Sequence, residues 1–291
     1  MLKNGSPEKP PERVDIKSLV HRESAFSLDD ARLLDRLLAT PQVGEIRQEF
    51  LTLQREASAS AKPSLSLLAR LGVGLYLLGH PREADRYLSH VTGDALAAFY
   101  RGLALSSLEQ HQEAADRFAE AAKLGYDKVE CTMRRAGELR ALGRLSDAEA
   151  LLRSVVGEAA RRAEYSYQMG CILSDRGDTY GAIEYFERAV DIDPRHSRAL
   201  FRLAVENASR GNDGEAIRLY ERALSHPPIH LGALINLGLM YEDDQNYQAA
   251  AFCFRRVLEV DPTNERAEMY LKDIQAVGEM YYDEDSALSL P

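Results

Sequence analysis

The chain contains 291 residues, of which 45% are hydrophobic and 28% are charged, and this composition is typical of a folded, helix-rich protein. Its net charge of -10 argues against a general nucleic-acid-binding protein, because phosphate contacts require an excess of Lys and Arg. No apolar run approaches the roughly 18 residues that a membrane-spanning helix requires, and residues 1–15 are too polar for a signal peptide, so we expect a cytoplasmic protein without membrane contact.

The three cysteines, Cys131, Cys171 and Cys253, are odd in number and far apart in the sequence. A disulfide framework needs paired cysteines and an oxidising compartment. We therefore expect three free thiols in a reducing compartment.

The first 57 residues do not share the pattern that repeats further along the chain. Residues 1–26 lack hydrophobic periodicity, which predicts a flexible tail. Ser27 and Asp30 have the spacing of a capping box, which predicts a helix from residue 28 to about residue 40. A second apolar stripe predicts a helix at about 43–57. We expect residues 27–57 to form an N-terminal helical hairpin that covers the first repeat.

One pattern occurs three times without an insertion, in residues 163–196, 197–230 and 231–264. Each copy has Gly or Ala at position 8, Ala at position 20, an aromatic residue at position 24 and Pro at position 32. Small residues allow two helices to approach closely, the aromatic residue fills the space beside them, and the proline ends the second helix. In chain order these residues are Gly170, Ala182, Phe186 and Pro194; Ala204, Ala216, Tyr220 and Pro228; Gly238, Ala250, Phe254 and Pro262.

Weaker copies of the same pattern precede these three. They span 65–94, which is four residues short, 95–128 and 129–162, and the last two lack the closing proline. Residues 265–281 begin a further first helix without a partner, and we expect them to cap the array. Residues 282–291 form an acidic and then apolar tail.

The 34-residue helix-turn-helix pattern resembles the tetratricopeptide repeat. The resemblance implies an all-α superhelical solenoid of antiparallel helix pairs, in which six copies stack because none can bury its apolar face alone. A shorter stretch, residues 273–285, resembles the junction in some bacterial tetratricopeptide proteins that continue into a domain like the C-terminal domain of the RNA polymerase alpha subunit. This second resemblance implies a transcription-associated adaptor as an alternative function.

The sequence contains no recognisable motif for catalysis or for binding a cofactor. It has no HExxH, no CxxC and no Gly-rich phosphate loop. His226 and His230 have the spacing of two metal ligands on a helix, but Pro227 and Pro228 lie between them and break such a helix. We predict a non-enzymatic protein with no catalytic residues, no cofactor and no metal.

The first helices of tetratricopeptide arrays line a concave face, so the resemblance implies a binding groove there. Position 5 of the copies is mostly aromatic or aliphatic, and arginines flank it. Aromatic anchors in a groove typically contribute about 2 kcal/mol or more to binding. The predicted groove residues are Phe99, Met133, Tyr167, Phe201, Ile235, Leu239 and Met269, with a basic rim of Arg134, Arg140, Arg198 and Arg202.

These groove residues have two interpretations. The main hypothesis is a protein-interaction scaffold that binds an extended or helical segment with apolar side chains and some acidic groups. The alternative is that the apolar residues pack first helices against their neighbours and that the arginines form a solvated helix face. A related hypothesis is that the tail, residues 286–291, occupies the groove of its own or another copy, which would give a homo-oligomer.

Overall fold

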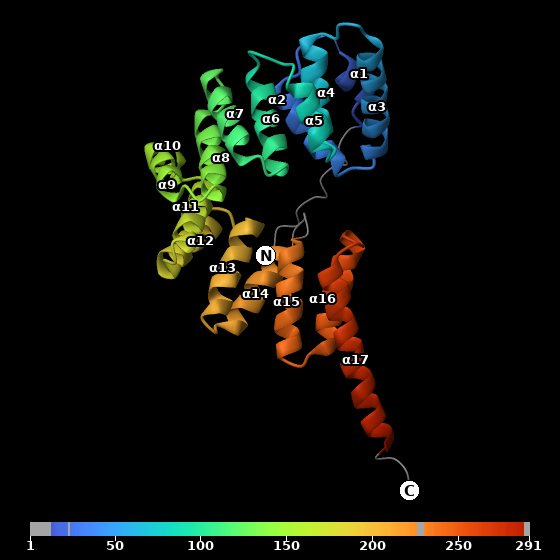
Figure 1. The fold of residues 1–291 in the computed structure, drawn as a ribbon, viewed down its shortest axis with the longest axis vertical. Coiled ribbons are helices and arrows are strands. Elements are labelled where there is room, and N and C mark those ends of the chain that lie inside the picture. Colours follow the sequence, from blue (N-terminus) through green and yellow to red (C-terminus); the bar gives the residue numbers. More distant parts are fainter. Residues whose placement is uncertain (1–12, 23, 226–229, 288–291) are drawn as a thin grey trace, which may run out of the picture. The chain divides into compact units, whose positions relative to one another are not determined.

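The computed structural model describes residues 13–22, 24–225 and 230–287, with side chains described as far as residue 276. All regular secondary structure within these residues is α-helical. The chain divides into two units, Met1–Ala148 and Glu149–Pro291, which are described separately (Figure 1).

Unit 1 contains an N-terminal group of short and medium helices, followed by α4 to α8, in which each helix packs on the next. Each weak copy of the sequence pattern in this unit begins with two helices, as predicted. The helices are α1 (Ile16–His21), α2 (Leu28–Leu38), α3 (Val43–Ala59), α4 (Leu65–Leu77), α5 (Pro81–Leu88), α6 (Ala95–Ser107), α7 (His111–Lys123), α8 (Lys128–Ala141) and α9 (Leu145–Ser154), which crosses the boundary between the units.

Helix α1 corrects the prediction of a flexible tail over residues 1–26. Asp15 caps this helix by accepting a hydrogen bond from the Ser18 amide at 3.0 Å. Ile16, Leu19 and Val20 share one face and are buried in the core of unit 1. The prediction was wrong here because three apolar residues within six are too short a pattern to recognise without the helices that bury them. Residues 1–12 lie outside the described part of the chain.

Arg70 of α4 holds the C-terminal end of α1 in place. Its guanidinium donates to the carbonyl oxygen of Val20 at 3.1 Å and to that of Ser24, and it lies over the Phe26 ring. The side chain is only 4% exposed. Burial, with a smaller contribution from Arg22, lowers the pKa of Arg70. Carbonyl oxygens at the C-terminal end of a helix carry partial negative charge, so they stabilise this buried cation.

Helices α2 and α3 occupy the residues expected for the N-terminal helical hairpin. The Ser27 hydroxyl accepts from the Asp30 amide at 3.2 Å, and the Asp30 carboxylate accepts from the Ser27 amide at 2.8 Å, so the predicted capping box is confirmed. Helix α3 extends to Ala59, two residues beyond the predicted end.

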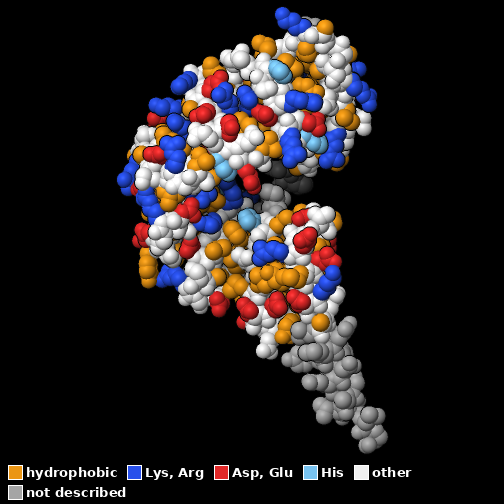
Figure 2. All heavy atoms as spheres, viewed as in Figure 1, with side chains coloured by type: hydrophobic (Ala, Val, Ile, Leu, Met, Phe, Trp, Pro, Cys, Tyr) orange, Lys and Arg blue, Asp and Glu red, His pale blue; other side chains and the backbone are white. Residues whose placement is uncertain are grey.

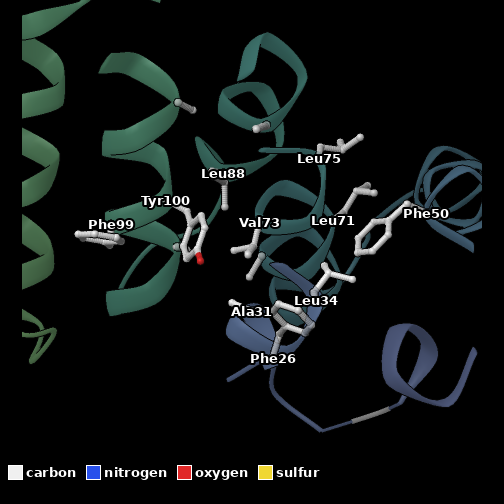
Figure 3. Packing of buried hydrophobic residues seen from close by; sticks show 14 of the residues in the cluster. Phe26, Ala31, Leu34, Phe50, Leu71, Val73, Leu75, Leu88, Phe99 and Tyr100 are labelled. Carbon is white, nitrogen blue, oxygen red and sulfur yellow. The ribbon is translucent and has the colours of Figure 1, made fainter. Parts of the chain in front are cut away.

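The core of unit 1 shows why α4 carries small residues on its buried face. Figure 3 shows Phe50 of α3 pointing toward Leu71 and Leu75 of α4, and Tyr100 of α6 pointing toward Val73. A Cβ atom on Gly74 would lie 1.9 Å from the nearest Phe50 ring atom. The close approach of α3 to α4 therefore depends on glycine at this position.

Unit 2 contains the three strong copies of the pattern as consecutive helix pairs. Gly170 and Gly238 face the rings of Phe186 and Phe254 so closely that an added Cβ would lie 2.7 Å from each ring. The predicted packing of position 8 against position 24 is therefore confirmed in these copies. The helices are α10 (Val156–Ala159), α11 (Ala163–Asp175), α12 (Thr179–Ile192), α13 (Ser197–Ser209), α14 (Asp213–Leu224), α15 (Leu231–Asp243), α16 (Tyr247–Val260) and α17 (Glu265–Ala287).

The capping helix α17 is longer than predicted. It continues six residues past the predicted end at residue 281, to Ala287. No proline lies between Pro262 and Pro291, so nothing in this stretch removes a backbone donor and stops the helix.

Each turn between paired helices places position 15 in the left-handed region of φ. Four of the six copies have glycine there, and two have a larger residue. The residues are Gly79, Glu109, Gly143, Gly177, Gly211 and Gln245.

Candidate protein-binding surface

The sequence pattern predicts a groove lined by the position 5 side chains. In the structure these side chains do not form one continuous exposed strip. Phe99, Met133 and Ile235 are 5%, 1% and 8% exposed, so they serve mainly to pack the first helices. Tyr167 and Phe201 are half-buried, and Met269 is 50% exposed. The alternative interpretation, packing between neighbouring helices, therefore applies to the first three residues, while the other three keep accessible surface.

The aromatic residues at position 5 stack on a ring supplied by the end of the same copy. Phe99 stacks on Tyr126 at 4.1 Å between ring centroids, and Phe201 stacks on His230 at 4.2 Å. Tyr167 lies 5.2 Å from the His196 ring in a tilted arrangement. Each ring is therefore held in one orientation by its own repeat.

His196 and His230 also cap the helices that follow them. Their Nδ1 atoms accept hydrogen bonds from the amides of Ala199 and Ala233, at 3.1 and 3.2 Å. Burial and the Arg198 charge lower the pKa of His230, which favours the neutral ring that this acceptor role requires. This capping role was not predicted, although both copies have a histidine at position 34. His226 lies outside the described residues.

The predicted basic rim is largely neutralised by acidic residues of the same chain. Arg198 pairs with Glu164 at 2.6 Å and lies over the Tyr167 ring at 4.8 Å. Arg202 donates to the Ser174 hydroxyl at 3.0 Å and lies 3.9 Å from the Asp175 carboxylate. These are local pairs within unit 2, so the rim offers less free positive charge than the sequence suggested.

In unit 1, the two remaining arginines of the predicted rim lie on α8. Arg134 pairs with Glu130 one turn earlier at 2.8 Å, and Arg140 is half-buried. Arg134 and Arg140 belong to unit 1, whereas Arg198 and Arg202 belong to unit 2.

Two buried glutamates link consecutive first helices. Glu138 accepts from Ser106 at 2.7 Å and contacts His111 at 2.7 Å. Glu206 accepts from Ser174 at 2.5 Å. Both acids are at position 10 of their copy and both serines at position 12 of the preceding one, a regularity that the sequence analysis did not use. These contacts fix the spacing of the first helices.

Five of the predicted groove residues on α11, α13 and α15 of unit 2 keep accessible surface, and we treat them as one candidate surface. It combines apolar side chains that are half-buried with two arginines whose side chains are 46% and 27% exposed. We call it the α11–α15 face, and it consists of Tyr167, Arg198, Phe201, Arg202 and Leu239. Met269 of α17 is exposed as well but lies on the next first helix along the chain.

The three cysteines are buried, and none of them forms a disulfide within the described part of the chain. Burial raises the pKa of Cys131 to about 12 and that of Cys253 to about 11. These two thiols are therefore protonated at neutral pH and are poor nucleophiles. In the described part of the chain, no helix is both long and apolar enough to cross a bilayer, and no cluster of three or more metal-ligating side chains is present.

Comparison with known families matches the strong copies of the pattern. Residues 167–228 and residues 232–264 each match a model described as tetratricopeptide repeat. An uncharacterized protein of Methanocaldococcus jannaschii is 35% identical over 48 residues, which cover 16% of this chain and 56% of the relative. The chain thus matches about half the length of this curated relative. Neither family model bears on the resemblance of residues 273–285 to RNA polymerase alpha fusions, which stays a hypothesis.

Solved structures of low sequence identity share the fold. The yeast Tom70 structure has a TM-score of 0.60 at 16% identity and covers 87% of this chain and 59% of its own. The structure of the APC/C hetero-tetramer Cut9-Hcn1 has a TM-score of 0.63 at 16% identity, covering 86% of this chain and 49% of that one. A tetratricopeptide protein of Thermus thermophilus has a TM-score of 0.54 at 15% identity, covering 63% of this chain and all of its own.

The family matches, the 34-residue period and the helix pairs agree with one another. Tetratricopeptide repeats are protein-interaction modules, and the chain has the architecture of such a scaffold. The chain contains tetratricopeptide repeats.

Proposed function

We propose that this protein is a non-enzymatic scaffold that binds an extended or helical segment of a partner protein on the α11–α15 face. The observation that carries the proposal is the state of Tyr167 and Phe201, whose rings are held against His196 and His230 while each residue keeps part of its surface accessible. A ring that is already ordered loses little conformational entropy when a ligand packs on it. Aromatic residues and arginine are also the residue types most enriched among interface hot spots.

The charge of the surface suggests what the bound segment contains. Arg198 keeps 46% of its side chain exposed although it pairs with Glu164. A ligand carboxylate can therefore share this guanidinium or replace Glu164 as its partner. We expect a ligand with apolar side chains for Tyr167, Phe201 and Leu239 and one or more acidic groups for Arg198.

The test uses synthetic peptides that combine aromatic or aliphatic residues with acidic ones, selected on a peptide array probed with the full chain. Binding of a selected peptide is then measured by calorimetry for the wild type, for Phe201→Ala and for Phe252→Ala. Phe252 is 59% exposed on α16 and lies outside the α11–α15 face, so it is a matched control. We expect Phe201→Ala to cost about 2 kcal/mol, roughly 30-fold in affinity, and Phe252→Ala to have little effect. Equal affinities for the two variants would contradict the proposal.

The acidic component of the ligand is tested separately with a reciprocal pair of variants. Arg198→Glu should weaken an acidic peptide because it removes the guanidinium. Glu164→Gln should strengthen the same peptide, because it removes the carboxylate that competes for Arg198. If neither variant changes the affinity, the ligand is recognised through its apolar side chains alone.

A further inference from the structure

A second surface, on unit 1, has the unpaired positive charge that the α11–α15 face lacks. Three adjoining hollows of about 220, 500 and 460 Å³ run along α3 and α5. The first and second share Leu51 and Gln54, and the second and third share Arg86 and Tyr87. They therefore form one continuous depression, which we call the α3–α5 furrow.

The furrow exposes large apolar side chains. Leu51 is 46% exposed and Leu65 is 52% exposed, and both line the hollows. The Tyr87 ring lines the wall between two hollows, and Phe50 with Leu75 lines the deeper end. Exposed leucines grouped in a depression are typical of a surface that another segment covers.

The cations that line the furrow have no carboxylate partner among the described residues. Arg47, Arg55 and Lys62 are exposed and form no ion pair or hydrogen bond with any described residue. The Arg86 guanidinium donates to the Tyr87 hydroxyl, lies over the Tyr87 ring and forms no ion pair with a described carboxylate. Figure 2 shows Lys and Arg side chains interspersed with hydrophobic ones over the region of α3 and α5.

The carboxylates near the furrow have partners elsewhere. Glu45 pairs with Arg13, Glu56 contacts His21, and Asp85 pairs with Arg101. The one carboxylate that lines the hollows is Glu83, which accepts a hydrogen bond from the neutral Gln54 at 2.9 Å. The furrow is therefore a basic and apolar depression.

The sequence contains one segment with the complementary chemistry. Residues 1–148 carry 21 basic and 21 acidic residues, whereas residues 149–291 carry 15 basic and 25 acidic ones, so the net charge of -10 lies entirely in the second unit. No Lys or Arg follows Lys272. Residues 279–291 combine four acids with apolar side chains, namely Glu279, Asp283, Glu284 and Asp285 with Met280, Tyr281, Tyr282, Leu288 and Leu290.

We propose that the α3–α5 furrow binds the C-terminal segment of this protein, residues 279–291. Its carboxylates pair with Arg47, Arg55, Lys62 and Arg86, and its apolar residues cover Leu51 and Leu65. The sequence analysis expected the tail in the groove of the first helices, but the arginines there already have carboxylate partners. The proposal concerns a different surface from the α11–α15 face and does not depend on the function proposed for it.

The test measures fluorescence anisotropy of a labelled synthetic peptide of residues 276–291 titrated with the full chain. The acceptor chain carries Asp283→Asn, Glu284→Gln and Asp285→Asn, so that its own segment competes weakly. We expect saturable binding, and we expect Arg55→Glu with Arg86→Glu in the acceptor to weaken it about tenfold or more. Arg32→Glu with Arg36→Glu is the matched control, because these exposed arginines of α2 give the same charge change outside the furrow.

A charge exchange separates a specific site from general attraction. A peptide with Asp283→Lys, Glu284→Lys and Asp285→Lys should bind the Arg55→Glu, Arg86→Glu acceptor more tightly than the wild-type peptide does. Three results would each overturn the proposal. The peptide does not bind the acceptor with an intact furrow, the α2 control loses as much affinity as the furrow variant, or the charge-exchanged peptide does not regain affinity. Circular dichroism of each acceptor confirms that the exposed substitutions leave the helices folded.

Discussion

At the scale of single residues, position 15 of each copy shows how a turn requirement is met by different side chains. Gly177 and Gly211 have φ of 82° and 74°, and Gln245 has φ of 59° at the equivalent position. The same backbone bonds close both kinds of turn, since the Gly177 and Gln245 amides each donate at 2.9 Å to the carbonyl three residues earlier. A side chain at this φ places its Cβ close to the following carbonyl, so Gln245 costs free energy that glycine avoids.

Replacing Gln245 with glycine should therefore stabilise the protein. We expect Gln245→Gly to raise the free energy of unfolding by about 1 kcal/mol, and Gly211→Gln to lower it by about the same amount. An added Cβ at Gly211 meets no atom within 4 Å, so the loss would reflect backbone conformation and not a clash. Urea unfolding followed by circular dichroism measures the free energy of unfolding of both variants. If Gly211→Gln stabilised the protein, the cost assigned to a side chain at positive φ would be contradicted.

His230 makes a pH-dependent contribution to the free energy of unfolding. Its pKa is lower in the folded protein than in the unfolded chain, because burial and Arg198 disfavour the charged ring. The stability from the neutral ring is fully present above the unfolded pKa of about 6.5 and is lost as the pH falls from there toward the folded pKa. We expect the free energy of unfolding to fall as the pH is lowered through about 6.5.

The variant His230→Asn keeps a side chain that can cap α15 but cannot titrate. Its free energy of unfolding should change less over the same pH range than that of the wild type. His90→Asn, at an exposed position, is the control and should behave as the wild type does. If His230→Asn and the wild type lose the same free energy of unfolding as the pH falls, His230 is not the source of the pH dependence.

At the scale of elements, α1 illustrates a helix that tertiary contacts stabilise. Six residues are too few for an isolated helix to be stable in water. Here the helix buries Ile16, Leu19 and Val20, and Arg70 binds the carbonyl groups at its end. The helix and the buried arginine therefore depend on each other.

Removing the Arg70 guanidinium should release α1 without unfolding the repeats. We expect Arg70→Met to cost roughly 2 to 3 kcal/mol, because the buried Val20 carbonyl and the partly buried Ser24 carbonyl lose a charged donor. Amide hydrogen exchange should rise in residues 16–21 and stay low in α6 and α7. Arg32→Ala removes an exposed arginine that pairs only with Asp29 and should leave exchange unchanged. Unaltered protection of α1 in Arg70→Met would show that the apolar contacts alone hold it.

At the scale of the whole molecule, the arrangement of contacts determines how far a local change spreads. Within each unit, α4 to α8 and α11 to α17 pack mainly on their neighbours in the sequence, as in other stacked arrays. Stability in such an array is close to a sum of terms for each repeat and each interface. A substitution in one repeat should therefore destabilise nearby helices more than distant ones.

Ala216→Leu provides the test of this locality. Ala216 is fully buried at position 20, so a larger side chain overpacks α13 against α14 at a cost of about 1 to 3 kcal/mol. Hydrogen exchange should increase in α13, α14 and α15 while α4 to α7 of unit 1 keep their protection. Ala276→Leu, at an exposed position of α17, is the control. A uniform increase along the chain would instead show that the array unfolds as one cooperative block.

The repeat pattern was predictable from the sequence because it is local and periodic. Gly170, Ala182 and Phe186 recur at fixed spacing, and each has the same packing role in every strong copy, so one copy predicts the others. The capping box of α2 was predictable for a similar reason, since both partners lie within four residues. Helix α1 and the extension of α17 depend on distant burial or on the absence of a stop signal, which are weak signals in a sequence.

The surface was less predictable than the fold. The sequence alone determined an array of helix pairs, since spacing fixes which residues share a face and small residues fix which helices approach closely. Only the tertiary structure decided which side chains of that face remain accessible: Phe99 is buried by Tyr126, while Phe201 keeps exposed surface beside His230. It also decided that Arg198 is paired with Glu164, 34 residues away, whereas Arg55 is not paired with any described residue. Exposure and charge pairing depend on contacts between repeats, and the pattern within one repeat does not contain them.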